Sequence, residues 1–262
     1  MRHEYDVVVA PLDDVRCAGS DFAGNRIRML RSARSWFEVP HTTVVSALTQ
    51  AWTFGAVAQQ LGELATRSNW LADSPLSVRL HLVSAEGRVL QNLPEFNNIS
   101  LGAFAELSAD MVTAAGPYSL SGPTSLVASV QAFRHRDLTV RAWADKDRDT
   151  VVFAGCWFLD EDLGSGLYFD RMTVNARTGS TDALELSTKP TATVATGGGT
   201  WTVEVAPELR HFWLFSLVNT TKLATAAREA SVHTGSDLAL VFAVRSDRTL
   251  LLDCQSLLPG ST

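Results

Sequence analysis

The stretch "SNWLADSPLSVRLHLVSAEGRVL", residues 68–90, decides the fold class predicted from this sequence. Within it, Val78 and Leu80 alternate with Arg79 and His81. This period of two is typical of a β-strand that buries one face and turns the other to water. The tripeptide "AEG" that follows predicts a reversal into a second, short strand.

The pattern on either side of this strand indicates many strands and few helices. Residues 43–66 carry apolar side chains at steps of three and four, which predicts one or two helices, and shorter helices are expected at 101–112 and 221–232. A strand is expected at 35–40, closed by a proline. After residue 124, short apolar runs alternate with turn residues. The predicted strands there span 125–133, 137–144, 150–159, 166–176, 184–187, 191–195, 200–205, 212–218, 237–245 and 249–253.

This element order predicts an all-β fold, an antiparallel jelly-roll β-sandwich with two or three helices in its connections. Residues 1–35 are expected to form an N-terminal strand and an extended arm that contains arginines, and residues 36–262 a single jelly-roll-like domain. No repeat or proline- and glycine-rich linker divides the chain.

Composition excludes some classes of function. The chain has 262 residues, a formal net charge of −6 and a pI near 5.5, which argues against a surface made throughout for nucleic acid. Cys17, Cys156 and Cys254 are widely spaced, so neither a disulfide framework nor a cysteine zinc site is expected. No apolar run approaches the ~18 residues of a membrane span, so no membrane partner is expected.

Three motifs suggest ligand chemistry but favour turns. In "DKDRD" (145–149), an EF-hand loop would need Gly and Glu where the sequence has Thr150 and Cys156, so a charged hairpin turn is predicted. "DEDLGSG" (160–166) is interpreted in the same way. "TGGGT" (196–200) leads into a strand, whereas a phosphate loop leads into a helix, so a hairpin loop is predicted. We therefore predict no catalytic residue, no cofactor and no metal site.

The basic segment "NRIRMLRSAR" (25–34) is the remaining candidate. Its arginines could fork onto phosphate oxygens of RNA or contact a neighbouring subunit, or they could pair with acids of this chain. The candidate contact residues are Arg26, Arg28, Arg31 and Arg34.

The order of elements resembles that of the jelly-roll coat proteins of small icosahedral picorna-like RNA viruses. The resemblance covers residues 36–253: a segment ending in proline, a helix, "NWLADSP" before the strand "LSVRLHL", and later "GTWTVEV", "FWLFSLV" and "SDLALVFAV". It implies a structural capsid subunit that is not an enzyme. Its expected partners are copies of itself, sister capsid subunits and RNA through the arm. Its expected location is the virion, assembled in the host cytoplasm.

Two other classes of function stay open. A β-sandwich module that binds carbohydrate or protein would expose aromatic side chains, and those to consider are Trp70, Trp143, Trp157 and Trp201. An enzyme on a β-sandwich scaffold would gather histidines and carboxylates from separate strands in one pocket. Fold alone does not choose between these classes.

Overall fold

The computed structural model groups the chain into two compact units, which are described separately. Unit 1 comprises Met1–Ser32 and Pro40–Arg134, and unit 2 comprises Ala33–Val39 and His135–Thr262. The residues that the structure describes are 7–48, 59–60, 62–63, 76–100, 102–104, 106, 125–131, 138–156, 158–160, 164–167, 171–185, 191–196, 199–204, 220–244 and 248–257.

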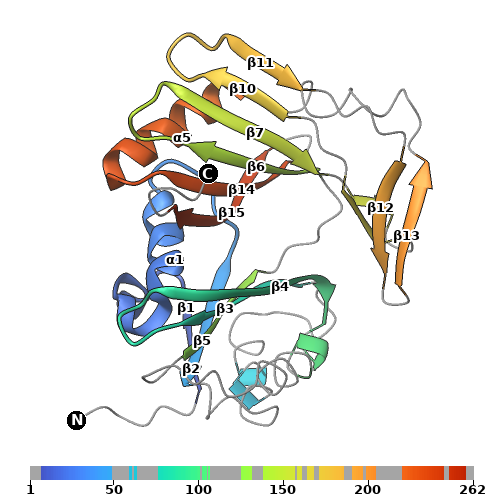
Figure 1. The fold of residues 1–262 in the computed structure, drawn as a ribbon. Helices are drawn as coiled ribbons and strands as arrows, with labels where there is room; N and C mark the ends of the chain where they lie inside the picture. The colour runs from blue at the N-terminus through green and yellow to red at the C-terminus, as the bar shows by residue number, and fades with distance from the viewer. Residues whose placement is uncertain are drawn as a thin grey trace. The chain divides into compact units, whose positions relative to one another are not determined.

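Unit 1 is built on a five-stranded antiparallel sheet with the order β1-β2-β5-β3-β4 (Figure 1). Its strands are β1 (Val8–Pro11), β2 (Thr42–Leu48), β3 (Leu76–Val83), β4 (Val89–Ile99) and β5 (Ser125–Gln131). The opening stretch of the sequence is therefore a strand at the predicted place, although β4 is longer than expected. Leu76, Val78, Leu80 and Leu82 belong to the apolar core of this unit.

The second face of β3 is also buried, which corrects the expectation that it faces water. Arg79 and His81 are 1% and 0% exposed. The guanidinium of Arg79 donates to the side-chain oxygen of Gln131 at 3.1 Å, and the amide of Gln131 donates to the hydroxyl of Thr42 at 3.3 Å. Polar side chains from β3, β5 and β2 thus hydrogen-bond to one another inside the unit, as most buried polar groups do.

The extended arm predicted within residues 1–35 is largely helical after β1. It contains the short 3-10 helix η1 (Val15–Ala18) and the helix α1 (Ser20–Ala33). The stripe Ala23, Ile27 and Leu30 is at most 1% exposed, so α1 packs as an ordinary amphipathic helix. The thiol of Cys17 lies in this segment, and burial raises its pKa to about 11, which keeps it protonated at neutral pH.

Gly24 interrupts α1 at its point of closest approach to the β3–β4 turn. Its backbone has φ 72° and ψ 169°, outside the helical region. A Cβ at this position would lie 3.0 Å from both methyl groups of Val83. The next amide, that of Asn25, donates to the carbonyl of Gly87 at 2.8 Å. Glycine is needed here both for the backbone conformation and for the space.

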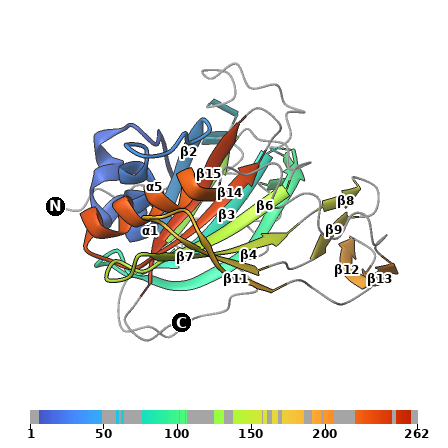
Figure 2. The same cartoon turned by 90° about the horizontal axis from the view of Figure 1, so that it is seen from above.

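Unit 2 is built on a six-stranded antiparallel sheet with the order β11-β10-β7-β6-β14-β15. Its strands are β6 (Leu138–Ala144), β7 (Thr150–Cys156), β10 (Arg171–Asn175), β11 (Thr181–Glu185), β14 (Leu238–Val244) and β15 (Thr249–Ser256). The helix α5 (Thr220–Thr234) lies across this sheet and contacts β6, β7, β10 and β14 (Figure 2).

A smaller four-stranded sheet has the order β13-β12-β9-β8. Its strands are β8 (Phe158–Asp160), β9 (Gly164–Leu167), β12 (Thr191–Thr196) and β13 (Gly199–Glu204). The hairpins predicted at 160–166 and 196–200 correspond to the antiparallel pairs β8–β9 and β12–β13. The hairpin predicted at 145–149 joins β6 to β7.

The segment 33–39 belongs to unit 2 although unit 1 precedes and follows it in sequence. Phe37 packs edge-on against Phe242, with 5.2 Å between the ring centroids. The ring centroids of Trp36 and of His233, at the end of α5, are 5.0 Å apart. The amide of Leu251 donates to the carbonyl of Glu38 at 2.7 Å. The strand predicted at 35–40 is therefore a docked connection, since these residues form turns and irregular backbone.

The jelly-roll prediction is wrong, and the fold is α+β. A jelly roll interleaves early and late strands within two packed sheets. Here β1 to β5 form one sheet and no described strand after residue 134 joins it. The predicted helix at 43–66 is also wrong at its start, because Thr42, Thr43, Val44 and Val45 are four consecutive β-branched residues and lie in β2. The strand predicted at 212–218 lies outside the described residues.

The Gly24→Ala substitution is expected to lower the free energy of unfolding by about 1–3 kcal/mol, because alanine is strained at positive φ and its Cβ meets Val83. Urea denaturation followed by circular dichroism measures this change.

The matched control is Gly102→Ala, at a helical glycine where an added Cβ would have nothing within 4 Å. This control should be neutral or slightly stabilising, because alanine favours helix. Equal midpoints for the two variants would contradict the assigned role of Gly24.

Candidate functional site

The two faces of the six-stranded sheet have different surroundings. On one face, Val140, Ala142 and Phe242 are at most 1% exposed. Helix α5 covers that face through Ala224, Ala227 and Ala230, each at most 1% exposed, and Phe37 joins them by its contact with Phe242 (Figure 2). Because side chains alternate along a strand, the residues between them in sequence lie on the opposite face.

That opposite face, called the open face, is less buried, because most of its side chains are half-buried or exposed. Strand register aligns its side chains in two rows that cross the sheet. One row runs Arg171, Ala154, Arg141, Val241 and Asp253 across β10, β7, β6, β14 and β15. The next row runs Thr173, Val152, Trp143, Ala239 and Gln255 across the same strands.

Two arginines dominate the first row. Arg141 and Arg171 are both exposed and stand on either side of Ala154. Neighbouring strands lie about 4.8 Å apart, so the two arginine Cα atoms are roughly 10 Å apart. The side chain of neither arginine forms a hydrogen bond or an ion pair with any residue in the described part of the chain. Two guanidinium groups therefore face the same small area with the short side chain of Ala154 between them.

Trp143 dominates the second row. It lies two residues after Arg141 on the same strand, so its Cα is roughly 7 Å away and its side chain is on the same face. Trp143 is half-buried, and its neighbours across the strands are Val152 and Ala239. The open face thus combines an indole ring in an apolar setting with cationic groups along one side.

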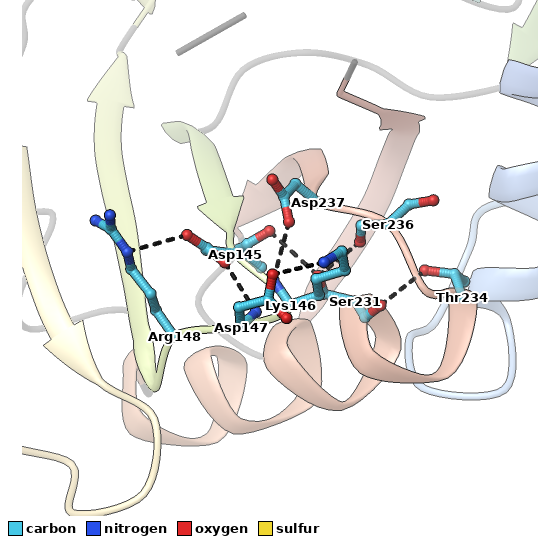
Figure 3. A network of polar contacts seen from close by, with 9 residues as sticks. Asp145, Lys146, Asp147, Arg148, Ser231, Thr234, Ser236 and Asp237 are labelled. Atoms are coloured by element: carbon cyan, nitrogen blue, oxygen red, sulfur yellow. Dashed lines mark hydrogen bonds and ion pairs between the residues drawn. The ribbon is translucent and has the colours of Figure 1, made fainter. Parts of the chain in front are cut away.

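A polar cluster at one end of the sheet, called the end clamp, holds these strands in place. It comprises Asp145, Lys146, Asp149, Arg177, Arg228, Ser231 and Asp237. The backbone amide of Lys146 donates to the carboxylate of Asp237 at 3.0 Å, which ties the β6–β7 turn to the start of β14 (Figure 3). The hydroxyl of Ser231 on α5 lies within hydrogen-bond distance of the carbonyls of Ala144, at 3.3 Å, and Ser236, at 2.7 Å.

Asp149 extends the end clamp to β10. Its carboxylate oxygens form ion pairs with the guanidinium nitrogens of Arg177, at 2.8 Å, and of Arg228 on α5, at 2.7 Å. Its backbone carbonyl accepts a hydrogen bond from the amide of Ala176, just after β10. One residue therefore connects the β6–β7 turn, the β10–β11 turn and α5, and so positions both arginine-bearing strands.

Asp145 and Asp147 are occupied by contacts within the 145–149 turn, in agreement with the predicted hairpin. Asp145 accepts a hydrogen bond from the amide of Asp147 and pairs with Arg148, and a side-chain hydrogen bond to Asp147 raises the pKa of Lys146 (Figure 3). Within the described ranges there is no group of three or more histidine, cysteine or carboxylate side chains placed to hold a metal ion. In those same ranges, no helix is long and apolar enough to cross a membrane.

The arginines predicted as contact residues differ in burial and are divided between the two units. Arg26 is buried at 9% exposure, Arg28 is exposed, and Arg31 is half-buried with its guanidinium donating to the carbonyl of Asp13 at 3.4 Å. Arg34 is exposed but follows α1 and belongs to unit 2. A role of this segment in contacting RNA or further copies of the chain stays a prediction.

The open face was not predicted as a site, although Trp143 was among the aromatic residues considered for a binding module. Trp70 and Trp157 lie outside the described residues, and Trp201 lies in β13. In the sequence "VRAW" (140–143), Arg141 and Trp143 are two residues apart, so they lie on one face of a strand. Arg171 is far away in sequence, so only the register of β10 against β7 brings it to Arg141.

Comparison with known proteins finds similar solved structures, and the three named below share 9–13% sequence identity with this chain. No protein-family model and no curated protein sequence matches. A dinucleotide-forming acetyl-coenzyme A synthetase from Ca. Korarchaeum cryptofilum matches at TM-score 0.46 and 13% identity, over 89% of this chain and 92% of that one. The D-alanine–D-alanine ligase of Bacillus anthracis matches at TM-score 0.37 and 11% identity, over 95% of this chain and 60% of that one. The ATP-grasp ligase PsnB matches at TM-score 0.32 and 9% identity, over 90% of this chain and 53% of that one.

These matches are enzymes, and they overturn the prediction of a viral coat protein. The implied capsid function, the virion location and the expectation that the chain is not an enzyme are withdrawn with it. The chain spans little more than half the length of the two ligases. At these TM-scores the likeness assigns neither a reaction nor a residue, so the function is argued from the open face itself.

Substituting Asp149 with alanine is expected to lower the free energy of unfolding by about 1–2 kcal/mol, because two partly exposed ion pairs are lost and two guanidinium groups are left without their carboxylate. Thermal denaturation followed by circular dichroism checks this expectation.

Asp147→Ala serves as the control, since that side chain is 77% exposed and pairs only within the turn. It should leave the midpoint nearly unchanged. If the two substitutions were equally mild, the end clamp would not hold the strands as described.

Proposed function

We propose that unit 2 binds a nucleotide, meaning a ligand with a planar heterocycle and a phosphate group, on the open face of its six-stranded sheet. The observation that carries the proposal is the juxtaposition of Arg141 and Arg171 around Ala154, one row away from Trp143.

The arginines supply the recognition of phosphate. A guanidinium presents a planar fork of N–H donors that matches the oxygens of a phosphate, and hydrogen bonds between charged partners are stronger than neutral ones. Because the guanidinium groups of Arg141 and Arg171 have no partner among the described residues, a phosphate would not have to displace an ion pair with one of them. Ala154 between them is short enough to let the anion approach the sheet.

Trp143 supplies the surface for the heterocycle. Stacking of a base on an aromatic side chain contributes about 1–3 kcal/mol and tolerates many bases, because every base has a π-face. The roughly 7 Å between the Cα atoms of Trp143 and Arg141 lets one ligand place its ring on the indole and its phosphate at the guanidinium. Ala239 and Val241 on β14 give the ring an apolar floor.

The double substitution of Arg141 and Arg171 with alanine is expected to weaken ATP binding by about 100-fold or more, and each single substitution by about 10-fold or more, because each removes charge-assisted hydrogen bonds. Trp143→Ala should weaken ATP but leave inorganic tripolyphosphate unchanged, because the latter has no ring to stack. Isothermal titration calorimetry at fixed salt measures both ligands.

The matched control is Arg148→Ala, which removes an arginine 77% exposed in the β6–β7 turn whose guanidinium pairs with Asp145. It should leave ATP binding unchanged. The proposal would be overturned if the wild-type protein bound no nucleotide, if the double variant bound ATP normally, or if only single-stranded oligonucleotides bound.

A further inference from the structure

We infer that Gln255 determines which heterocycle the open face accepts, by hydrogen bonding to the edge of the ring that stacks on Trp143. This inference rests on the proposed nucleotide-binding function and adds the residue that sets its specificity.

The distribution of charge across the open face orients the ligand. In the first row, Arg171 and Arg141 lie on the β10 side, whereas Asp253 lies on β15 at the other end. The phosphate is therefore drawn toward β10, and the remainder of the ligand extends toward β14 and β15.

The side chains of the second row leave room for a ring in that direction. From Trp143 the row continues to Ala239 and then to Gln255. The Cα atoms of Trp143 and Gln255 are two strand spacings apart, roughly 10 Å. Ala239 is half-buried and has the smallest side chain of the three, so a planar ring against the indole covers Ala239 and brings its far edge to Gln255.

Gln255 has the chemistry to read that edge. Its amide offers two N–H donors and one carbonyl acceptor, and it is half-buried on the edge strand β15. It forms no side-chain hydrogen bond with any residue in the described ranges. Glutamine amides form paired hydrogen bonds with adenine, whose donor and acceptor pattern differs from that of guanine. Thr173, the hydroxyl at the other end of the row, lies on the side toward which the phosphate is drawn.

The experiment compares ATP, GTP and inorganic tripolyphosphate by isothermal titration calorimetry on the full chain, for the wild type and Gln255→Leu. The wild type is expected to prefer one of the two nucleotides. In Gln255→Leu that preference should fall by about 5-fold to 100-fold, because leucine fills a similar volume without hydrogen-bonding groups. The affinity for tripolyphosphate should not change.

Two further variants keep the result interpretable. Ser256→Ala alters the exposed neighbour of Gln255, which points to the opposite face of β15, and should change none of the three affinities. Ala239→Leu fills the space beside Trp143 and should weaken both nucleotides while sparing tripolyphosphate. Thermal denaturation of each variant shows whether it is folded.

The possible failures are distinguishable. If the wild type binds no nucleotide, the proposed function fails and this inference fails with it. If nucleotides bind but show no preference, or if folded Gln255→Leu keeps the wild-type preference, the role of Gln255 is overturned and the nucleotide site stands. A loss of tripolyphosphate binding in Gln255→Leu equal to the loss of nucleotide binding would also overturn it.

Discussion

The open face depends on the register of β6 against its two neighbours, β7 and β14. Side chains alternate with a period of two, so a slip of one residue would turn Arg141 and Trp143 toward α5 and bring Val140 and Ala142 to the solvent. Burying a guanidinium among the alanines of α5 would be costly, and exposing the apolar residues would lose their burial. Burial of the covered face therefore fixes the strand register that places Arg141 and Trp143 on the open face. The contacts of the end clamp stabilise the same register at the turns.

Unit 1 uses arginine in the opposite way. Arg79 is 1% exposed, and its guanidinium hydrogen-bonds to Gln131, which in turn contacts Thr42. This chain of hydrogen bonds links the three central strands of its sheet from a single face. A buried guanidinium that hydrogen-bonds across strands helps to specify how they pair, whereas an exposed one, such as that of Arg141, is available to a ligand. Residue type alone does not separate these roles, and burial does.

Local signals were sufficient for the hairpins and for several strands. The turn at 145–149 followed from its Asp residues and from the flanking apolar runs, and β3, β5, β6, β14 and α5 lie close to their predicted positions. The sequence did not distinguish helix from strand where both patterns were present. A stripe of small apolar residues favoured a helix through β2, although its first residues are β-branched, and Gly24 obscured the helical period of α1. The prediction of the architecture was wrong because strand order within sheets is set by contacts between residues distant in sequence.

The open face could not be predicted for the same reason. Tertiary packing decides which face of the sheet α5 covers, and it places Arg171 near Arg141.

The docking of residues 33–39 on unit 2 has a consequence for how this protein can be divided. The backbone passes from unit 1 to unit 2 at residue 33, returns at residue 40, and passes again at residue 135. A fragment that starts at residue 135 would lack Phe37 and leave Phe242 without its ring contact, while a fragment that ends at residue 134 would carry an orphaned Trp36 and Phe37. Each unit is compact, but neither is encoded by one continuous stretch of sequence. Insertion, duplication or exchange of either one as a contiguous piece of sequence would damage both.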